Sequence, residues 1–326
     1  YQKLENWAKK QKDAFFKPKK KKNLLFVFAD QWRRDAMGFA KADPVKTPNM
    51  DAFASESVYC TDAISTFPLC SPHRASLLTG KNPLHTGVFT NCKTGLAMGL
   101  KEEEYCIGDV LKDCGYQTGY IGKWHLESLP SGFDYWQIVP GQGDYYNPNF
   151  ITQQNDTIQK HGYITNIITD DAIDWMEHKR DDKKPFCLFI HHKAIHRNWM
   201  ADTCNLALYE DKTFPLPDNF FDDYEGREAA AAQEMSIVKD MDMIYDLKML
   251  RPDKNSRLKT LYESFLGRMD SAQRAAWEKF YGPIIEDFYK KNPQGKDLAN
   301  WKFQRYMRDY MKTVKSLDDN VGRVLD

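Results

Sequence analysis

The stretch Asn23-Leu-Leu-Phe-Val-Phe-Ala29, followed by Asp30 and Gln31, decides the fold class of this 326-residue chain. An uninterrupted apolar run of strand length is typical of a parallel sheet that helices cover on both faces. Polar side chains at the C-terminal end of such a strand lie where α/β folds bind ligands. Asp30 and Gln31 carry hard oxygen atoms, which suit Ca²⁺ or Mg²⁺. They are therefore candidate metal ligands.

Two later segments repeat this arrangement, in which a strand is followed by basic side chains. Residues 116–122 predict a strand that leads into Lys123 and His125, and residues 186–190 predict another that leads into residues 191–199. The carboxyl ends of parallel strands share one edge of a sheet, so these side chains can face the same crevice as Asp30. Three histidines within six residues suggest a metal site, but the oxygen atoms of Asp30 and Gln31 favour a harder ion.

Residues 70–80, Cys-Ser-Pro-His-Arg-Ala-Ser-Leu-Leu-Thr-Gly, predict a short helix that begins at the cysteine. Pro72 suits the first turn, and Gly80 suits the end. The positive end of the helix dipole and the nearby Arg74 both favour an anion at Cys70. These features indicate a nucleophile. A buried structural cysteine before a short helix is the alternative interpretation of the same residues.

The same stretch resembles the signature of type I, formylglycine-dependent sulfatases, Cys-x-Pro-x-Arg followed by Leu-Thr-Gly. His73 stands where many members carry Ser. Residues 122–126, Gly-Lys-Trp-His-Leu, are similar to the second motif of that family. Residues 193–199 resemble its Lys-Ala-Pro-His-Arg-Pro-Trp motif, with Ile195 and Asn198 in place of the two prolines. We expect this loss of both prolines to loosen the segment.

The resemblance implies a role for each matching residue. Cys70 would be oxidised after synthesis to formylglycine, whose hydrate is the nucleophile. The other implied catalytic groups are Arg74, which steadies the formylglycine, Lys123, which grips the sulfate, His125, which assists the nucleophile, and His196, which faces the sulfate and the leaving oxygen. Substrate contacts are expected from Lys123, His196, His192 and Arg197. A calcium ion would be held by Asp30, Gln31 and the residue at position 70.

The resemblance also implies the fold, an alkaline-phosphatase-like α/β sandwich with a large mixed, mainly parallel sheet flanked by helices. We expect residues 1–22 to be a polar lead-in and residues 23–326 to be the N-terminal, incomplete part of the catalytic domain, with a smaller C-terminal subdomain beyond residue 326. Residues 131–162 predict long loops. A helical insertion is expected at about residues 222–310, because the runs 226–250 and 256–290 carry apolar residues at helical spacing.

Composition excludes several classes of protein. Lys and Arg together number 46, as do Asp and Glu, and this balance disfavours nucleic-acid binding, which needs a basic face. No apolar run approaches the roughly 20 residues that span a bilayer. The chain opens without Met, which suggests a processed N-terminus and a periplasmic or secreted protein, with a lysosomal one as the alternative. Disulfide pairing among the seven cysteines stays open.

The pattern of motifs looks like that of bacterial carbohydrate sulfatases, and the helical insertion resembles enzymes that act on 6-O-sulfated N-acetylglucosamine in host glycans or glycosaminoglycans. Such an enzyme implies a maturation partner, either a formylglycine-generating enzyme or an anaerobic sulfatase-maturating enzyme. One alternative is a phosphonate or phosphate monoester hydrolase of the same superfamily. Another is a non-catalytic glycan-binding relative, which would be expected to have lost Cys70, Lys123 or His196. All three are present.

Overall fold

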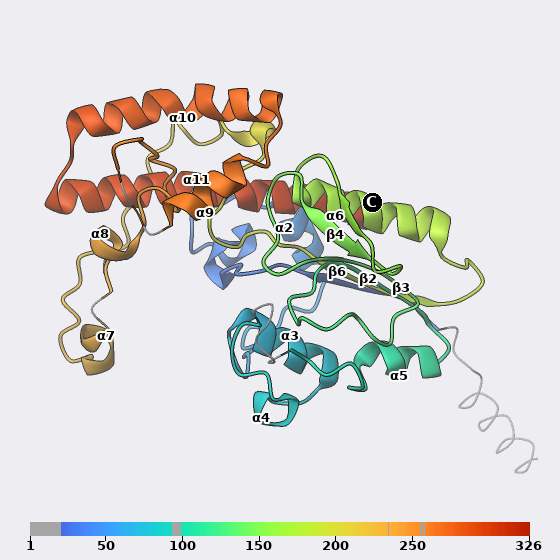
Figure 1. Cartoon of the computed structure of the whole chain (residues 1–326). Helices are drawn as coiled ribbons and strands as arrows, with labels where there is room; N and C mark the ends of the chain where they lie inside the picture. The colour runs from blue at the N-terminus through green and yellow to red at the C-terminus, as the bar shows by residue number, and fades with distance from the viewer. Residues whose placement is uncertain (1–20, 93–98, 234, 255, 257) are drawn as a thin grey trace, which may run out of the picture.

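The computed structural model describes residues 21–92, 99–233, 235–254, 256 and 258–326. Its centre is a six-stranded sheet of order β1-β6-β2-β3-β4-β5 (Figure 1). The first four strands in this order run parallel. Strand β4 then pairs antiparallel with β3, and β5 pairs antiparallel with β4. The bounds of the strands are Leu24–Phe28 (β1), Gln117–Lys123 (β2), Tyr135–Val139 (β3), Asn149–Thr152 (β4), Thr157–Gln159 (β5) and Phe186–His191 (β6).

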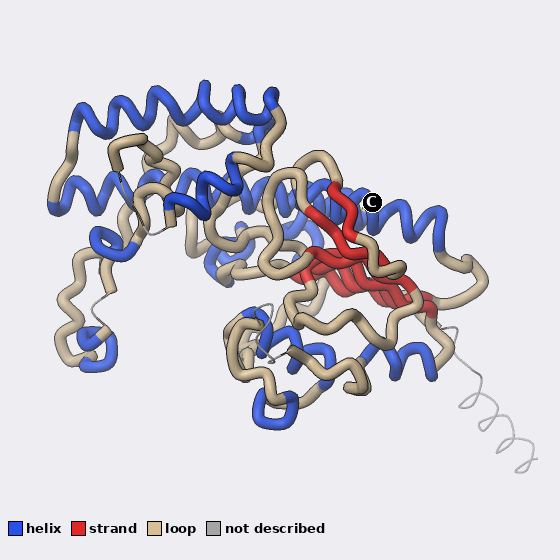
Figure 2. Tube along the Cα trace, viewed as in Figure 1, coloured by secondary structure: helices blue, strands red, loops and turns tan. Residues whose placement is uncertain are grey.

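Helices cover both faces of this sheet, as Figure 2 shows in blue around the red strands. One face carries α6 (Ile164–Asp174), which a π-helical turn at Trp175–Lys179 extends, and the C-terminal part of α11 (Gly295–Leu325). The other face carries α3 (Cys70–Thr79) and α5 (Ile107–Asp113) (Figure 1).

Neighbouring residues of each central strand alternate between two apolar cores. In β2, Tyr120 packs with α3 while Ile121 packs with α6, and in β6 Phe189 and Ile190 divide in the same way. Both faces of such a strand are buried, so apolar residues are favoured at every position rather than at every second one. This accounts for the continuous apolar runs in the sequence and confirms the predicted α/β sandwich.

Gly122 is required where β2 approaches β6. It lies opposite His191 in the parallel pairing and has a φ of 108°. A Cβ at this position would lie 2.1 Å from the carbonyl oxygen of His191. Only glycine tolerates this conformation and this close approach. The glycine therefore allows Lys123 to end its strand beside the end of β6.

The helical part of the chain is only partly as predicted. Residues 256–290 form α9 (Lys259–Leu266) and α10 (Ser271–Lys291), as expected, and α11 follows them. The described residues of the range 226–250 contain only two short helices, α7 (Glu228–Ala232) and α8 (Ile237–Asp240), so the expected helical run there is wrong. Asp242 explains part of this, because its Oδ1 accepts the backbone N–H of Ile244 and of Tyr245. Such local bonds compete with a helix.

One other prediction needs correction. Residues 131–162 are not all loop, since they form β3, β4 and β5. The remaining elements are short: Arg34–Ala36 (η1), Gly38–Ala40 (η2), Pro48–Ser55 (α2), Pro83–Thr86 (α4) and Thr203–Asn205 (η4). The predicted polar lead-in lies, up to residue 20, outside the described residues.

Two further observations concern the described part of the chain as a whole. None of its helices is both long and apolar enough to cross a lipid bilayer. It contains no disulfide, although all seven cysteines lie within it.

Candidate active site

The site lies at the edge of the sheet where β1, β2 and β6 end and α3 begins. Asp30 follows β1, Lys123 is the last residue of β2, and Cys70 is the first residue of α3. The end of β1 and the start of α3 border a cavity of about 440 Å³. Its lining includes Asp30, Gln31, Cys70, His73, Arg74 and His196. The strand ends therefore bring together residues that lie far apart in the sequence, as the sequence analysis predicted.

Asp30 is the electrostatic centre of the site. One of its carboxylate oxygens, Oδ2, lies 2.6 Å from Nζ of Lys123 and 3.1 Å from Nη2 of Arg74. Burial opposes the ionised form of Asp30, but Lys123 and Arg74 outweigh it and hold the pKa of this carboxyl well below its usual range. Asp30 is therefore an anion under two buried cations.

Cys70 lies beside this charged group. Its Sγ is 3.7 Å from Oδ1 of Asp30 and 3.9 Å from Nζ of Lys123. Burial is the largest influence on this thiol and raises its pKa, against the effect of Lys123. The thiolate that the helix dipole and Arg74 were expected to favour is thus not favoured, because burial outweighs the effects of Lys123 and Arg74 on the pKa of this thiol. An unmodified Cys70 is a poor nucleophile, since only the thiolate attacks efficiently.

The ring of His196 is held by the backbone of the next residue. Its Nδ1 lies 2.6 Å from the carbonyl oxygen of Arg197. A carbonyl only accepts, so the proton is on Nδ1 and the lone pair is on Nε2. Burial, followed by Lys193 and Lys123, lowers the pKa of His196 to about 3. The ligand atoms of His196, Cys70 and Asp30 all lie within 4.8 Å of one another.

The other histidines of the motifs are more enclosed. His125 is tied to α3 through its carbonyl, which accepts the Ser71 hydroxyl at 2.6 Å. Burial, followed by Lys123 and Arg74, lowers the pKa of His125 to about 4. The Nδ1 of His191 lies 2.9 Å from Nη1 of Arg74 and therefore accepts that N–H. The ring of His191 thus holds the arginine rather than facing the cavity.

Neither His192 nor Arg197, both expected to contact substrate, reaches the cavity around Cys70. His192 is completely buried, and neither ring nitrogen has a hydrogen-bond partner among the described residues. The guanidinium of Arg197 instead forms two hydrogen bonds with the Asp246 carboxylate, at 2.5 and 2.7 Å. Their proposed substrate contacts find no support in these positions.

The sequence analysis did not assign a role in the site to two polar residues, Gln142 and Lys193. Nζ of Lys123 donates to Oε1 of Gln142 at 2.5 Å, and Nζ of the buried Lys193 donates to the backbone oxygen of Gln142 at 3.1 Å. Gln142 stands between Gly141 and Gly143, whose φ values are 53° and 71°. For Gln142, the signal available in the sequence was a polar side chain between two glycines.

The donor atoms of the site suit a hard cation such as Ca²⁺. Asp30 supplies a carboxylate, and an oxygen in place of the Cys70 sulfur would be a second donor. Oε1 of Gln31 already accepts the backbone N–H of Arg197 at 3.0 Å, and this leaves it one lone pair. Calcium takes six to eight oxygen ligands. The described residues therefore fit part of a calcium site.

Comparisons with known proteins agree with this geometry. The family described as Sulfatase matches residues 22–326. An N-acetylglucosamine-6-O-sulfatase of Bacteroides thetaiotaomicron is 40% identical over 316 residues, which cover 94% of this chain and 55% of that protein. An ulvan-active sulfatase of Formosa agariphila is 39% identical over 181 residues, 52% of this chain and 34% of that protein.

A solved structure shares the same fold. It holds its substrate, D-glucosamine-2-N,6-O-disulfate, is 39% identical, and superposes with a TM-score of 0.85 over 94% of this chain and 62% of its own. The chain thus spans little more than half the length of the first relatives it matches.

Proposed function

The chain belongs to the sulfatase family, and from this premise we propose that the protein hydrolyses sulfate monoesters of carbohydrates. The proposed substrate is 6-O-sulfated N-acetylglucosamine in host glycans or glycosaminoglycans. One observation carries the proposal: Cys70, Lys123 and His196 converge on Asp30 at the edge of the sheet. The relative named for N-acetylglucosamine-6-O-sulfate supports the choice of sugar.

The proposed nucleophile is the hydrate of a formylglycine derived from Cys70. The raised pKa of the Cys70 thiol supports this, because the unmodified side chain would attack poorly. A formylglycine at position 70 would supply this hydrate: one of its hydroxyls would give up its proton and attack sulfur, while the bond from sulfur to the sugar oxygen breaks and that oxygen takes a proton. Loss of the proton of the second hydroxyl would then break the carbon–oxygen bond to sulfate and restore the aldehyde, which water would rehydrate.

The neighbouring side chains have the other proposed roles. Lys123 binds a sulfate oxygen, and Arg74 positions the residue at position 70. His125 assists the attack on sulfur and the later release of sulfate. His196 presents the lone pair of Nε2 at rest. A bound sulfate ester adds a negative charge nearby and favours the protonated ring. That ring then gives its proton to the leaving oxygen, a step typically worth about 10²–10⁴-fold.

Calcium is the proposed cofactor, with Asp30, Gln31 and the residue at position 70 among its ligands. When bound, the ion supplies positive charge beside the non-bridging oxygens of the sulfate. The proposed maturation partner is a formylglycine-generating or an anaerobic sulfatase-maturating enzyme. Because the proposed substrates are glycans outside the cytoplasm, the proposed location is the periplasm or the exterior of the cell.

A panel of esters tests the reaction and its specificity. The matured protein should release sulfate from N-acetylglucosamine-6-sulfate faster than from galactose-based 6-sulfates, and faster than it releases phosphate from the matching phosphate ester. The Cys70→Ala variant should show none of these activities. Preferred turnover of the phosphate ester would favour the superfamily's phosphate or phosphonate monoester hydrolases. Binding of the sugar without any turnover would favour a glycan-binding protein.

A further inference from the structure

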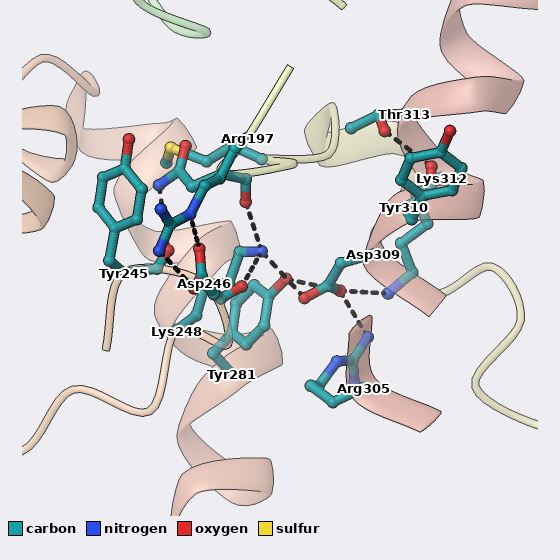
Figure 3. Close-up of polar contacts among 12 residues, drawn as sticks. Arg197, Tyr245, Asp246, Lys248, Tyr281, Arg305, Asp309, Tyr310, Lys312 and Thr313 are labelled. Carbon is teal, nitrogen blue, oxygen red and sulfur yellow. Dashed lines mark hydrogen bonds and ion pairs between the residues drawn. The ribbon is translucent and has the colours of Figure 1, made fainter. Parts of the chain in front are cut away.

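A buried ionic cluster lies outside the cavity around Cys70, where α10, α11 and the turn between α8 and α9 meet (Figure 3). At its centre is Asp309 of α11, whose side chain has no exposed surface. Oδ1 of Asp309 lies 2.6 Å from Nη2 of Arg305 and accepts the Tyr281 hydroxyl at 3.0 Å. The other oxygen, Oδ2, lies 3.2 Å from Nζ of Lys248. We call Asp309, Arg305, Lys248, Lys312 and Glu210 the Asp309 cluster.

Lys248 connects this cluster to the loop that carries His196. Its Nζ is fully enclosed and donates to the carbonyl oxygen of Asn198 at 2.7 Å and to that of Asp246, also at 2.7 Å. Nζ of Lys248 thus makes two hydrogen bonds, to Asn198 and Asp246, and an ion pair with Asp309. A shift of this ammonium group would break at least one of these three contacts.

Asp246 holds the same loop through a second contact. Its carboxylate accepts Nε and Nη2 of Arg197 at 2.5 and 2.7 Å, and only 3% of this side chain is exposed. A fork of two parallel bonds fixes the direction of the guanidinium as well as its distance. Asp246 and Lys248 thus clasp residues 197 and 198 from one short turn, which Figure 3 shows beside α11.

The position of the Arg197 carbonyl decides where the ring of His196 points. That carbonyl accepts the proton on Nδ1 of His196, and this bond keeps the lone pair of Nε2 for the cavity. On its other side, the N–H of Arg197 is bonded to Gln31, which lines the cavity. The short path therefore runs from Asp309 through Lys248 and Asn198 to Arg197 and His196.

We propose that Lys248 and Asp246 are positioning residues for His196, and that Asp309 anchors Lys248. The proposal rests on the proposed role of His196 in the reaction. The helical layer then does more than cover the sheet: it replaces, with buried hydrogen bonds, the stiffness that two prolines give this loop in the motif it resembles. A displacement of about 1 Å at a reacting group is enough to cost about 10²-fold in rate.

Lys312 provides a matched control for Lys248. Both are fully enclosed lysines near Asp309, with Nζ at 3.6 Å from Oδ1 for Lys312 and at 3.2 Å from Oδ2 for Lys248. Nζ of Lys312 lies 2.6 Å from Glu210, and no described contact joins it to residues 196–199. Lys248→Met and Lys312→Met therefore each remove one buried charge from the same cluster, but only the first removes a bond to the His196 loop.

The test compares these two variants in the full-length, matured protein. We expect Lys248→Met to lower kcat about 10- to 100-fold with little change in KM, and Lys312→Met to keep kcat near the wild-type value. Asp246→Asn, which keeps the shape of the side chain and lies outside the cluster, should lower kcat in the same direction even if Lys248→Met fails to fold. Equal losses of kcat in Lys248→Met and Lys312→Met, or an unchanged kcat in folded Lys248→Met and Asp246→Asn, would overturn the proposal.

Hydrogen exchange separates this proposal from the proposed function. The amides of residues 197–199 should exchange faster in Lys248→Met or Asp246→Asn than in wild-type protein, and at the wild-type rate in Lys312→Met. If matured wild-type protein released no sulfate, the proposed function would be contradicted. The exchange rates would still show whether Lys248 holds residues 197–199 in place. Unchanged exchange in all three variants would overturn the positioning role.

Discussion

Two buried aspartates, Asp30 and Asp309, are each paired with buried cations, but only Asp30 borders a cavity. We call the surroundings of Asp30 the open site and the Asp309 cluster the closed site. Each carries a pKa that burial would raise and that neighbouring cations hold well below the usual range. Asp30 is 7% exposed and borders a cavity, with the sulfur of Cys70 at 3.7 Å from its Oδ1. Asp309 is completely buried and is surrounded by Arg305, Lys248 and Tyr281.

The difference shows that access, rather than charge pairing, separates a reactive site from a structural one. The cavity beside Asp30 leaves space for an ion or a sulfate. Asp309 has no such space, so its charge only binds elements together. The perturbed pKa values alone would not distinguish the two, because structural networks perturb them as well.

The largest expected effect is on stability and belongs to the closed site. Replacing Asp309 with Ala leaves Arg305 and Lys248 buried without their shared partner, and breaking such a pair costs about 3–5 kcal/mol. Urea unfolding should show this loss. The matched control on α11 is Asp319→Ala, which removes a half-exposed partner of Lys315 and should cost less than about 1 kcal/mol. Similar losses in both variants would contradict the distinction.

The open site should lose activity instead. Asp30→Asn removes the anion that organises Lys123 and Arg74, and kcat/KM should fall by about 10²–10³-fold, as when one preorganised electrostatic group is lost. Its effect on the free energy of unfolding should be smaller than that of Asp309→Asn, because the side chain at position 30 borders a cavity that water can enter. Steady-state kinetics and urea unfolding of both variants give the comparison. Retained activity in Asp30→Asn, together with a stability loss equal to that of Asp309→Asn, would contradict the distinction between the open and the closed site.

The histidines sharpen the boundary of the open site. His196→Ala and His125→Ala should each lower kcat/KM by at least about 10²-fold, the low end for general acid–base groups. His191→Ala should act mainly on stability, because its ring accepts from Arg74. Kinetics and thermal unfolding of the three variants separate these outcomes. The assignment of roles would be wrong if His191→Ala abolished turnover in a folded protein while His196→Ala did not.

The smallest expected effect concerns Lys193, at the buried margin of the open site. Burial, followed by Lys123, lowers its pKa to about 7, whereas an unfolded lysine titrates near 10.4. Above pH 7 the unfolded chain therefore holds a proton that the folded protein releases, so stability rises with pH. Between pH 7 and 8 this contributes at most about 1.4 kcal/mol. Urea unfolding at both pH values should show the rise in wild-type protein and lose it in Lys193→Met; an equal rise in both would refute the assignment.

The sequence predicted the open site far better than the closed one. The apolar runs before Asp30 and Lys123 indicated parallel strands, and strand ends share an edge, so their convergence with Cys70 followed from local patterns. The Asp309 cluster draws on residues 210, 248 and 305–312, which only tertiary packing brings together. On α11 these charged residues share the helical spacing of a solvated face, and no local pattern marks them as buried.

The most direct test of the account is the chemical state of residue 70 in active protein. Trypsin should release residues 47–74 as one peptide, which contains both Cys60 and Cys70. Mass spectrometry of matured protein that releases sulfate from N-acetylglucosamine-6-sulfate should show the mass loss of a thiol converted to an aldehyde at position 70, with the thiol of Cys60 intact as the internal control. An unmodified thiol at Cys70 in fully active protein would contradict the mechanism.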